Sequence, residues 1–203
     1  ACTTELASLL GVTSHVFPMS VDPVQTTVHT GAGDLPFQHY FVRDQCEPVV
    51  SGFSFDGISA ARPNREVMRR LQQKAYGSVI ICPSNPFVSI DPILQLPGLW
   101  MALRNSPAPV YVVSPIVGGK ALKGPAAKMM NELGMDVSAL GVARHYCARY
   151  PGLIDCFVID QGDATMAQAI RDLGVEVALT STVMKNRADK RELARFMLDL
   201  GGS

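Results

Sequence analysis

Short runs of β-branched and aliphatic residues alternate through most of this chain with longer segments whose apolar residues recur at helical spacing. The runs predict strands over 79–82, 110–113, 156–159 and 176–179, and the longer segments predict helices over 64–75, 91–105, 125–133, 138–146, 165–173 and 189–200. Residues 97–98, Pro-Gly, predict a break in the second helix. Strands that alternate with helices indicate a mainly parallel sheet covered on both faces. We therefore expect an α/β, Rossmann-like three-layer fold.

The first third of the chain has a different texture. Residues 5–10 predict the end of a helix closed by Gly11, and residues 12–19 predict a strand. Residues 25–30 and 37–43 flank the turn 31–34 and read as a hairpin, which residues 49–55 extend. We expect a β-hairpin insertion over residues 20–58 within a single α/β domain that covers residues 1–203.

Charge and composition exclude several classes of partner. The 203 residues are 47% hydrophobic, and Lys plus Arg equals Asp plus Glu at 18 each, so no global field attracts nucleic acid or an anionic membrane. No apolar run approaches the ~20 residues that span a bilayer, and no leader-like segment is present. Five cysteines without a Cys-x-x-Cys pair favour free thiols in the cytoplasm over disulfides or zinc.

Polar side chains follow each of the four predicted parallel strands. They are Ser84 and Asn85, Ser114, Asp160 and Asp163, and Thr180 to Thr182. Because the carboxyl ends of parallel strands lie along one edge, where such folds bind ligands, these groups predict a binding crevice. Helix capping is the alternative for each of them. Asn85 is the strongest candidate, since prolines on both sides of the Ser-Asn pair restrict the backbone and leave the amide free to project into the crevice.

A glycine-rich stretch over residues 118–125 follows the second of these strands. It is not a Walker loop, because the Gly-Lys-Ser/Thr ending is absent. Gly124 suits a helix N-cap and Pro125 the first turn, so the helix would present free N–H groups to the crevice. Lys120 and Lys123 would add charge to a diphosphate, although a flexible connection with solvated lysines remains the alternative.

Other catalytic signatures are absent from the sequence. There is no Gly-x-Ser-x-Gly elbow and no His-Glu-x-x-His, and the four histidines are scattered. His145, which follows Arg144, is compatible with a phosphate contact and equally with an ordinary place at a helix end.

Two long blocks carry a resemblance. Residues 83–98 read as Pro-Ser-Asn-Pro, then Ser-Ile-x-Pro-Ile-Leu-x-Leu-Pro-Gly, and residues 114–130 contain Ser-Pro-Ile-Val-Gly-Gly followed by Lys-Gly-Pro-Ala-Ala-Lys-Met-Met. With the supporting pieces 17–24 and 141–146, the chain resembles the 2-phospho-L-lactate transferase family, which makes the deazaflavin coenzyme F-420. The similarity extends over nearly the whole chain.

The resemblance implies transfer of a 2-phospholactyl, phosphoenolpyruvyl or related phospho-three-carbon-acid group. The donor would be its guanosine diphosphate-activated form, the acceptor the deazaflavin Fo and the released product GMP. It also implies Mg²⁺ and a cytoplasmic protein, and it leaves a homo-oligomer open. Together with loop position, it indicates a nucleotide and diphosphate site formed by Ser84, Asn85, Ser89, Ser114, Gly118, Gly119 and Gly124. The catalytic residues and the metal ligands are assigned to no position.

One departure separates the chain from the family pattern. The family opens with a Gly-Gly-x-Gly strand-loop-helix and acidic residues that hold the deazaflavin, and this sequence has no counterpart before Ala1. We therefore expect the carboxyl-terminal two-thirds of such an enzyme, with the acceptor side and metal ligands outside it and no activity in the isolated chain. Two alternatives remain: an inactive truncated fragment, or a non-catalytic nucleotide-sugar-binding regulator of the same fold, which typically has Pro-Gly-Ser where 83–85 stands.

Overall fold

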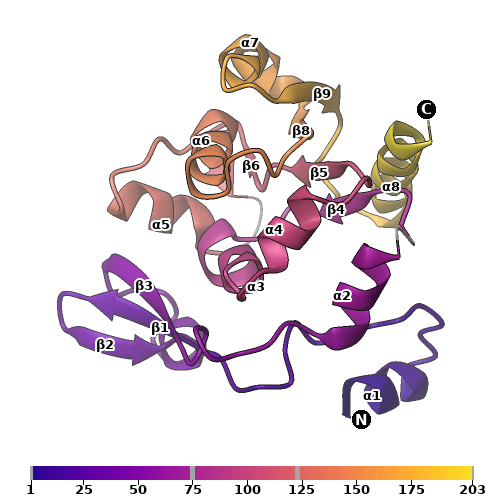
Figure 1. The fold of residues 1–203 in the computed structure, drawn as a ribbon. Helices are drawn as coiled ribbons and strands as arrows, with labels where there is room; N and C mark the ends of the chain where they lie inside the picture. Colours follow the sequence, from indigo (N-terminus) through magenta and orange to yellow (C-terminus); the bar gives the residue numbers. More distant parts are fainter. Residues whose placement is uncertain (1, 74–75, 122–123, 203) are drawn as a thin grey trace.

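A four-stranded parallel sheet is the centre of the fold. The computed structural model describes residues 2–73, 76–121 and 124–202. The strands lie in the order β4 (Val79–Ile81), β5 (Val110–Val113), β8 (Cys156–Asp160) and β9 (Glu176–Thr180), all parallel. Figure 1 shows them between helices on either side. The α/β, mainly parallel prediction is confirmed.

Side-chain alternation along β5 divides the core between two faces. Val110 and Val112 join the larger cluster, which includes residues of α4 (Leu99–Arg104), α6 (Ala139–Arg149) and α7 (Ala167–Arg171). Tyr111 and Val113 join the smaller cluster, which includes residues of α8 (Arg187–Gly201). The Tyr111 hydroxyl also donates to the Leu200 carbonyl at 2.9 Å. All four β5 side chains are buried, as expected for a strand covered on both faces.

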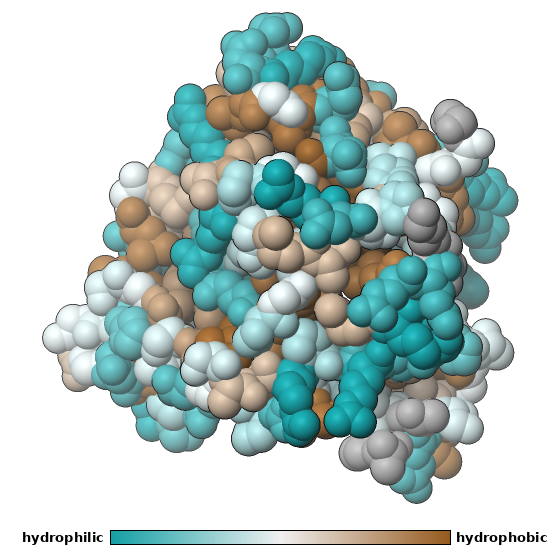
Figure 2. All heavy atoms as spheres, in the orientation of Figure 1, coloured by the Kyte–Doolittle hydropathy of each residue, from teal (hydrophilic) through white to brown (hydrophobic). Residues whose placement is uncertain are grey.

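Local capping sets several helix boundaries. Asn64 caps α2 (Arg65–Gln72), Ser138 caps α6, and Asn186 with Asp189 forms a capping box at α8. The predicted break falls where expected, because Gly98 at φ 80° separates α3 (Asp91–Leu94) from α4. The surface over α2 is strongly hydrophilic in Figure 2, where Glu66 pairs with Arg69 and Arg70.

A second, antiparallel sheet lies at the lower left of Figure 1, away from the parallel one. Its strands are β1 (Gln25–Thr30), β2 (Gly33–Pro36) and β3 (Val50–Asp56), in the order β2-β1-β3. It contacts the rest of the molecule through the stacked rings of Phe53 and Phe87, whose centroids are 5.7 Å apart. The Val50 amide also donates to the Glu132 carboxylate at 3.0 Å. We call residues 25–56 the antiparallel unit.

The remaining elements connect the two sheets or flank them. They are α1 (Cys2–Leu9), η2 (Pro86–Ile90), the hairpin of β6 (Ile116–Val117) with β7 (Lys120–Ala121), α5 (Ala126–Glu132) and η3 (Gln161–Met166). The predicted helix over 165–173 is therefore a 3₁₀ turn that passes into α7. No helix in the described part of the chain is both long and apolar enough to cross a bilayer.

The strand predicted over residues 37–43 is wrong. The structure has a helical segment there, ending in the π-helical turn η1 (His39–Arg43). Tyr40 is fully buried in it, and its hydroxyl donates to the Cys46 carbonyl at 3.3 Å. The alternation of apolar and polar residues suited either form, and burial of the Tyr40 ring favours the helical one.

The strand predicted over residues 12–19 is also wrong. These residues are mostly exposed and form no ladder, and the nearest β-type contact is the single bridge between Ser20 and Pro63. A run of β-branched residues becomes a strand only where a neighbouring strand accepts its backbone hydrogen bonds.

Candidate functional site

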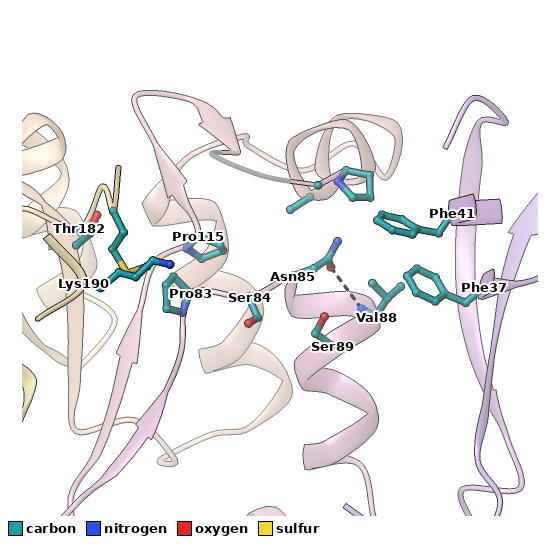
Figure 3. Close-up of a pocket in the computed structure, with 14 residues that line it drawn as sticks. Phe37, Phe41, Pro83, Ser84, Asn85, Val88, Ser89, Pro115, Thr182 and Lys190 are labelled. Carbon is teal, nitrogen blue, oxygen red and sulfur yellow. Dashed lines mark hydrogen bonds between the residues drawn. The ribbon is translucent and has the colours of Figure 1, made fainter. Parts of the chain in front are cut away.

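The carboxyl ends of β4 and β5 open onto a cavity of about 510 Å³. Its walls come from the loops after β4 and β5 with η2, the segment leading into α5, the helical segment of the antiparallel unit, and the loop after β9 with the start of α8 (Figure 3). The lining residues are Phe37, Phe41, Pro83, Ser84, Asn85, Val88, Ser89, Pro115, Gly124, Pro125, Ala126, Thr182, Met184 and Lys190. The volume lies within the range of ordinary small-ligand sites.

Asn85 has a structural role in this wall. Its side-chain oxygen accepts the Phe87 amide at 2.9 Å and the Val88 amide at 3.3 Å, which caps η2. Its side-chain nitrogen lies 3.2 Å from the Met129 sulfur, a weak acceptor. An amide nitrogen carries two donors, so Asn85 retains donor capacity toward the cavity after the cap is satisfied.

Ser84 and Ser89 lie on either side of Asn85 along the same wall. Ser84 is half-buried and Ser89 is exposed, and both line the cavity. Neither hydroxyl has a hydrogen-bond partner among the residues that the structure describes. Two hydroxyls that flank a fixed amide supply donors and acceptors to a polar ligand.

Gly124 lies on the wall that leads into α5. It has φ +71°, a conformation that side chains other than hydrogen rarely adopt. The position of the cap differs from the prediction: Pro125, not Gly124, is the residue immediately before α5. Lys123, predicted to add charge here, lies outside the described residues.

Three predicted site residues do not line the cavity. Ser114 is buried, and its hydroxyl donates to the Ile116 carbonyl at 2.9 Å and accepts the Ile116 amide at 3.2 Å. Gly118 and Gly119 form the left-handed turn between β6 and β7, where the Gly118 amide donates to the Asp163 carboxylate at 3.1 Å. These residues shape the backbone beside the crevice, and Lys120 lies exposed in β7 of the same hairpin.

Asp160 and Thr182 join the ends of β8 and β9. The Asp160 carboxylate accepts the Thr182 amide at 2.8 Å and the Gly162 amide at 2.9 Å. Burial raises the pKa of Asp160, but the hydrogen bonds from Gly162 and Thr182 outweigh it, and the pKa lies below its ordinary value. The bond holds Thr182, itself buried, at the cavity wall.

Apart from Thr182, the two ends of the cavity carry little signal in the sequence. One end is formed by Phe37 and Phe41, within the residues predicted as a strand, and their i, i+4 spacing is the available signal. The other end includes Lys190, an exposed residue of α8 that no motif marks. An ammonium group there supplies positive charge in a cavity whose lining residues include no carboxylate.

A mostly buried polar cluster around Asp91 packs against η2. Asp91, the first residue of α3, accepts the Tyr150 hydroxyl at 2.9 Å and lies 3.1 Å from the His145 ring nitrogen Nε2. The Arg149 guanidinium lies 3.6 Å from the same carboxylate. His145 also meets the Phe87 ring edge to face at 5.0 Å. His145 is therefore a partner of Asp91, and it does not line the cavity.

The described residues do not form a site suited to Mg²⁺. Among them, no group of three or more His, Cys, Asp or Glu side chains is placed to hold a metal ion. Mg²⁺ is bound in proteins through one or two carboxylates and the phosphates of a substrate, and the residues lining the cavity supply no carboxylate. No step of a reaction is assigned to this ion.

Comparison with known proteins covers almost the whole chain. The family model for 2-phospho-L-lactate transferase CofD matches residues 1–194. A 2-phospho-L-lactate transferase of Methanosarcina acetivorans is 37% identical over 198 residues, which are 98% of this chain and 62% of that protein. One from Methanothermobacter thermautotrophicus is 38% identical over 93% of this chain and 58% of its own. The chain therefore spans about three-fifths of the length of these relatives.

A solved structure supports the fold independently. The crystal structure of a member of the UPF0052 family from Bacillus halodurans superposes with a TM-score of 0.64, covering 95% of this chain and 64% of that one at 14% identity. At that identity the likeness concerns the fold alone. The family assignment comes from the match over residues 1–194. The chain belongs to the 2-phospho-L-lactate transferase CofD family.

Proposed function

We propose that this protein transfers a 2-phospholactyl, phosphoenolpyruvyl or related phospho-three-carbon-acid group from a guanosine diphosphate-activated donor to the deazaflavin Fo, releasing GMP in the cytoplasm. The observation that carries the proposal is the convergence of Ser84, Asn85, Ser89 and Gly124 on one cavity at the carboxyl edge of the sheet. Membership of the family supports the type of reaction.

The polar wall is suited to the diphosphate of such a donor. Phosphoryl transfer depends mainly on holding the reacting groups in line and stabilising the charge that develops on the phosphoryl oxygens. Ser84, Ser89 and the remaining donor of Asn85 would orient the phosphate oxygens, and Lys190 would balance their charge. The turn at Gly124 leaves the opposite wall without a side chain that would fill this space.

Nucleotide preference is the first test of the proposal. Isothermal titration calorimetry with purified protein should show tighter binding of GDP than of UDP-N-acetylglucosamine. The reverse preference would move the protein to the nucleotide-sugar-binding regulators of this fold.

Turnover is the second test. The chain, and a fusion that adds the part of the Methanosarcina acetivorans relative that lies outside the match, would be incubated with Fo, Mg²⁺ and the guanosine-activated acid. GMP release that depends on Fo, by either form, supports the proposal. Failure of both forms to bind GDP and to release GMP would overturn it.

A further inference from the structure

Two aromatic rings of the antiparallel unit form one end of the cavity. Phe37 and Phe41 are separated by one helical turn, and their centroids lie 5.5 Å apart with the planes inclined by 22°. In the strand that the sequence pattern predicted, residues four apart would be separated by about 13 Å, too far for their rings to stack. Phe41 remains 44% exposed although it is a large apolar side chain.

The rings face the polar wall across the cavity. Figure 3 shows Phe37 and Phe41 projecting from the antiparallel unit toward Asn85 and Val88, with Thr182 and Lys190 at the far end. The cavity thus has an aromatic end, a polar middle and a cationic end. A ligand that matches this order carries a planar ring, hydrogen-bonding groups and an anion.

A second stacked pair, between the antiparallel unit and η2, provides a comparison. Phe53 and Phe87 stack at 5.7 Å and 13°. Phe87 is only 3% exposed and belongs to the core, so that pair joins the two parts of the fold. Phe37 and Phe41 line open space instead.

We propose that Phe37 and Phe41 are a stacking wall that binds a planar heteroaromatic ring of a ligand in this cavity, and that Lys190 binds an anionic group in the same cavity. The inference rests on the proposed function and deepens it by naming residues that select for the ring. Aromatic side chains attract heteroaromatic rings in offset or edge-to-face arrangements, and stacking of a base on such a ring contributes about 1–3 kcal/mol. The guanine of the donor and the deazaflavin of the acceptor share this chemistry, so the test contains an arm for each.

Removing one ring while keeping apolar volume isolates the stacking. Phe41→Leu is the main variant because Phe41 is partly exposed, and Phe41→Trp keeps an aromatic face. Each protein would be titrated with GDP and inorganic pyrophosphate by calorimetry, and with Fo by the quenching of its fluorescence. We expect Phe41→Leu to lower the affinity for a ring-bearing ligand about tenfold, which corresponds to about 1.4 kcal/mol, and to leave the affinity for pyrophosphate unchanged. Phe41→Trp should restore the affinity.

Two control variants separate ring binding from other effects. Phe53→Leu alters the structural pair, so it should lower the melting temperature without changing the ratio of GDP to pyrophosphate affinity. Lys190→Gln should lower the affinities for GDP and pyrophosphate and leave the affinity for Fo, which carries no phosphate, unchanged.

The outcomes are distinct. Weaker GDP binding by Phe41→Leu with unchanged Fo binding identifies the ring as guanine, and the opposite result identifies it as the deazaflavin; both support the proposal. Unchanged binding of all three ligands, or an equal loss for pyrophosphate, would overturn it while leaving the proposed function intact. Wild-type protein that binds neither GDP nor Fo would overturn both.

Discussion

Replacement of Asp91 by Ala should destabilise the protein strongly. The Asp91 side chain is only 6% exposed, and it accepts a hydrogen bond from the Tyr150 hydroxyl and pairs with His145 and Arg149. Removing the carboxylate leaves the Tyr150 hydroxyl and the His145 ring nitrogen buried without their partner, at about 1–3 kcal/mol for each unsatisfied group, whereas the half-exposed Arg149 can be solvated. For a chain of this size each kcal/mol corresponds to about 2–4 °C, so a loss of about 2–6 kcal/mol should lower the melting temperature by about 4–24 °C.

The assay is thermal unfolding followed by circular dichroism, with two further variants. Tyr150→Phe removes one hydroxyl from the cluster and should cost about 1–3 kcal/mol. Asp22→Asn breaks the exposed pair with Arg62 and should barely change the melting temperature. At about 2–4 °C per kcal/mol, a melting temperature of Asp91→Ala within about 2 °C of the wild type corresponds to at most about 1 kcal/mol. That result would mean that the cluster contributes nothing measurable to the free energy of unfolding, and it would refute the reasoning.

Three further predictions concern single positions. Asn85→Ala should weaken GDP binding and also lower the melting temperature, since the side chain caps η2; a loss of stability with unchanged affinity per folded molecule would assign Asn85 to the cap alone. The pKa of Asp160 is lowered in the folded protein, so its stabilising effect is present above pH ~4 and is lost as the pH falls below that value. Acid unfolding of Asp160→Asn should therefore be less steep than that of the wild type, and an identical acid limb would contradict the assignment. Gly141→Ala should destabilise α6, because the added carbon would overlap the Asp136 carbonyl oxygen; an unchanged melting temperature would mean that this backbone shifts freely.

The candidate site could be predicted from sequence only in part. Ser84, Asn85, Ser89 and Gly124 line one cavity because each follows a strand or precedes a helix at the same edge of the sheet. Ser114 also follows a strand, but its hydroxyl bonds the backbone two residues on, a local competition that chain position does not reveal. The site roles of the cavity residues themselves stay predictions.

Around the parallel sheet, the sequence by itself determined the order of strands and helices and most of their boundaries. These features depend on local chemistry: β-branched runs, apolar spacing, Asn and Ser caps, and the left-handed Gly98 that ends one helix before the next begins. Such signals lie within a few residues of the element that they specify. They were therefore readable without knowledge of the partners that each element meets.

Only the tertiary structure decided the helical shape of residues 37–43 and the composition of the cavity's ends. Burial of Tyr40 makes that segment helical and brings Phe37 against Phe41. Packing also pairs Asp91 with His145, which lies 54 residues further along the chain. Long-range contacts of this kind decide between local conformations that have similar energies, because burying an aromatic ring contributes more than the small difference in intrinsic propensity between strand and helix.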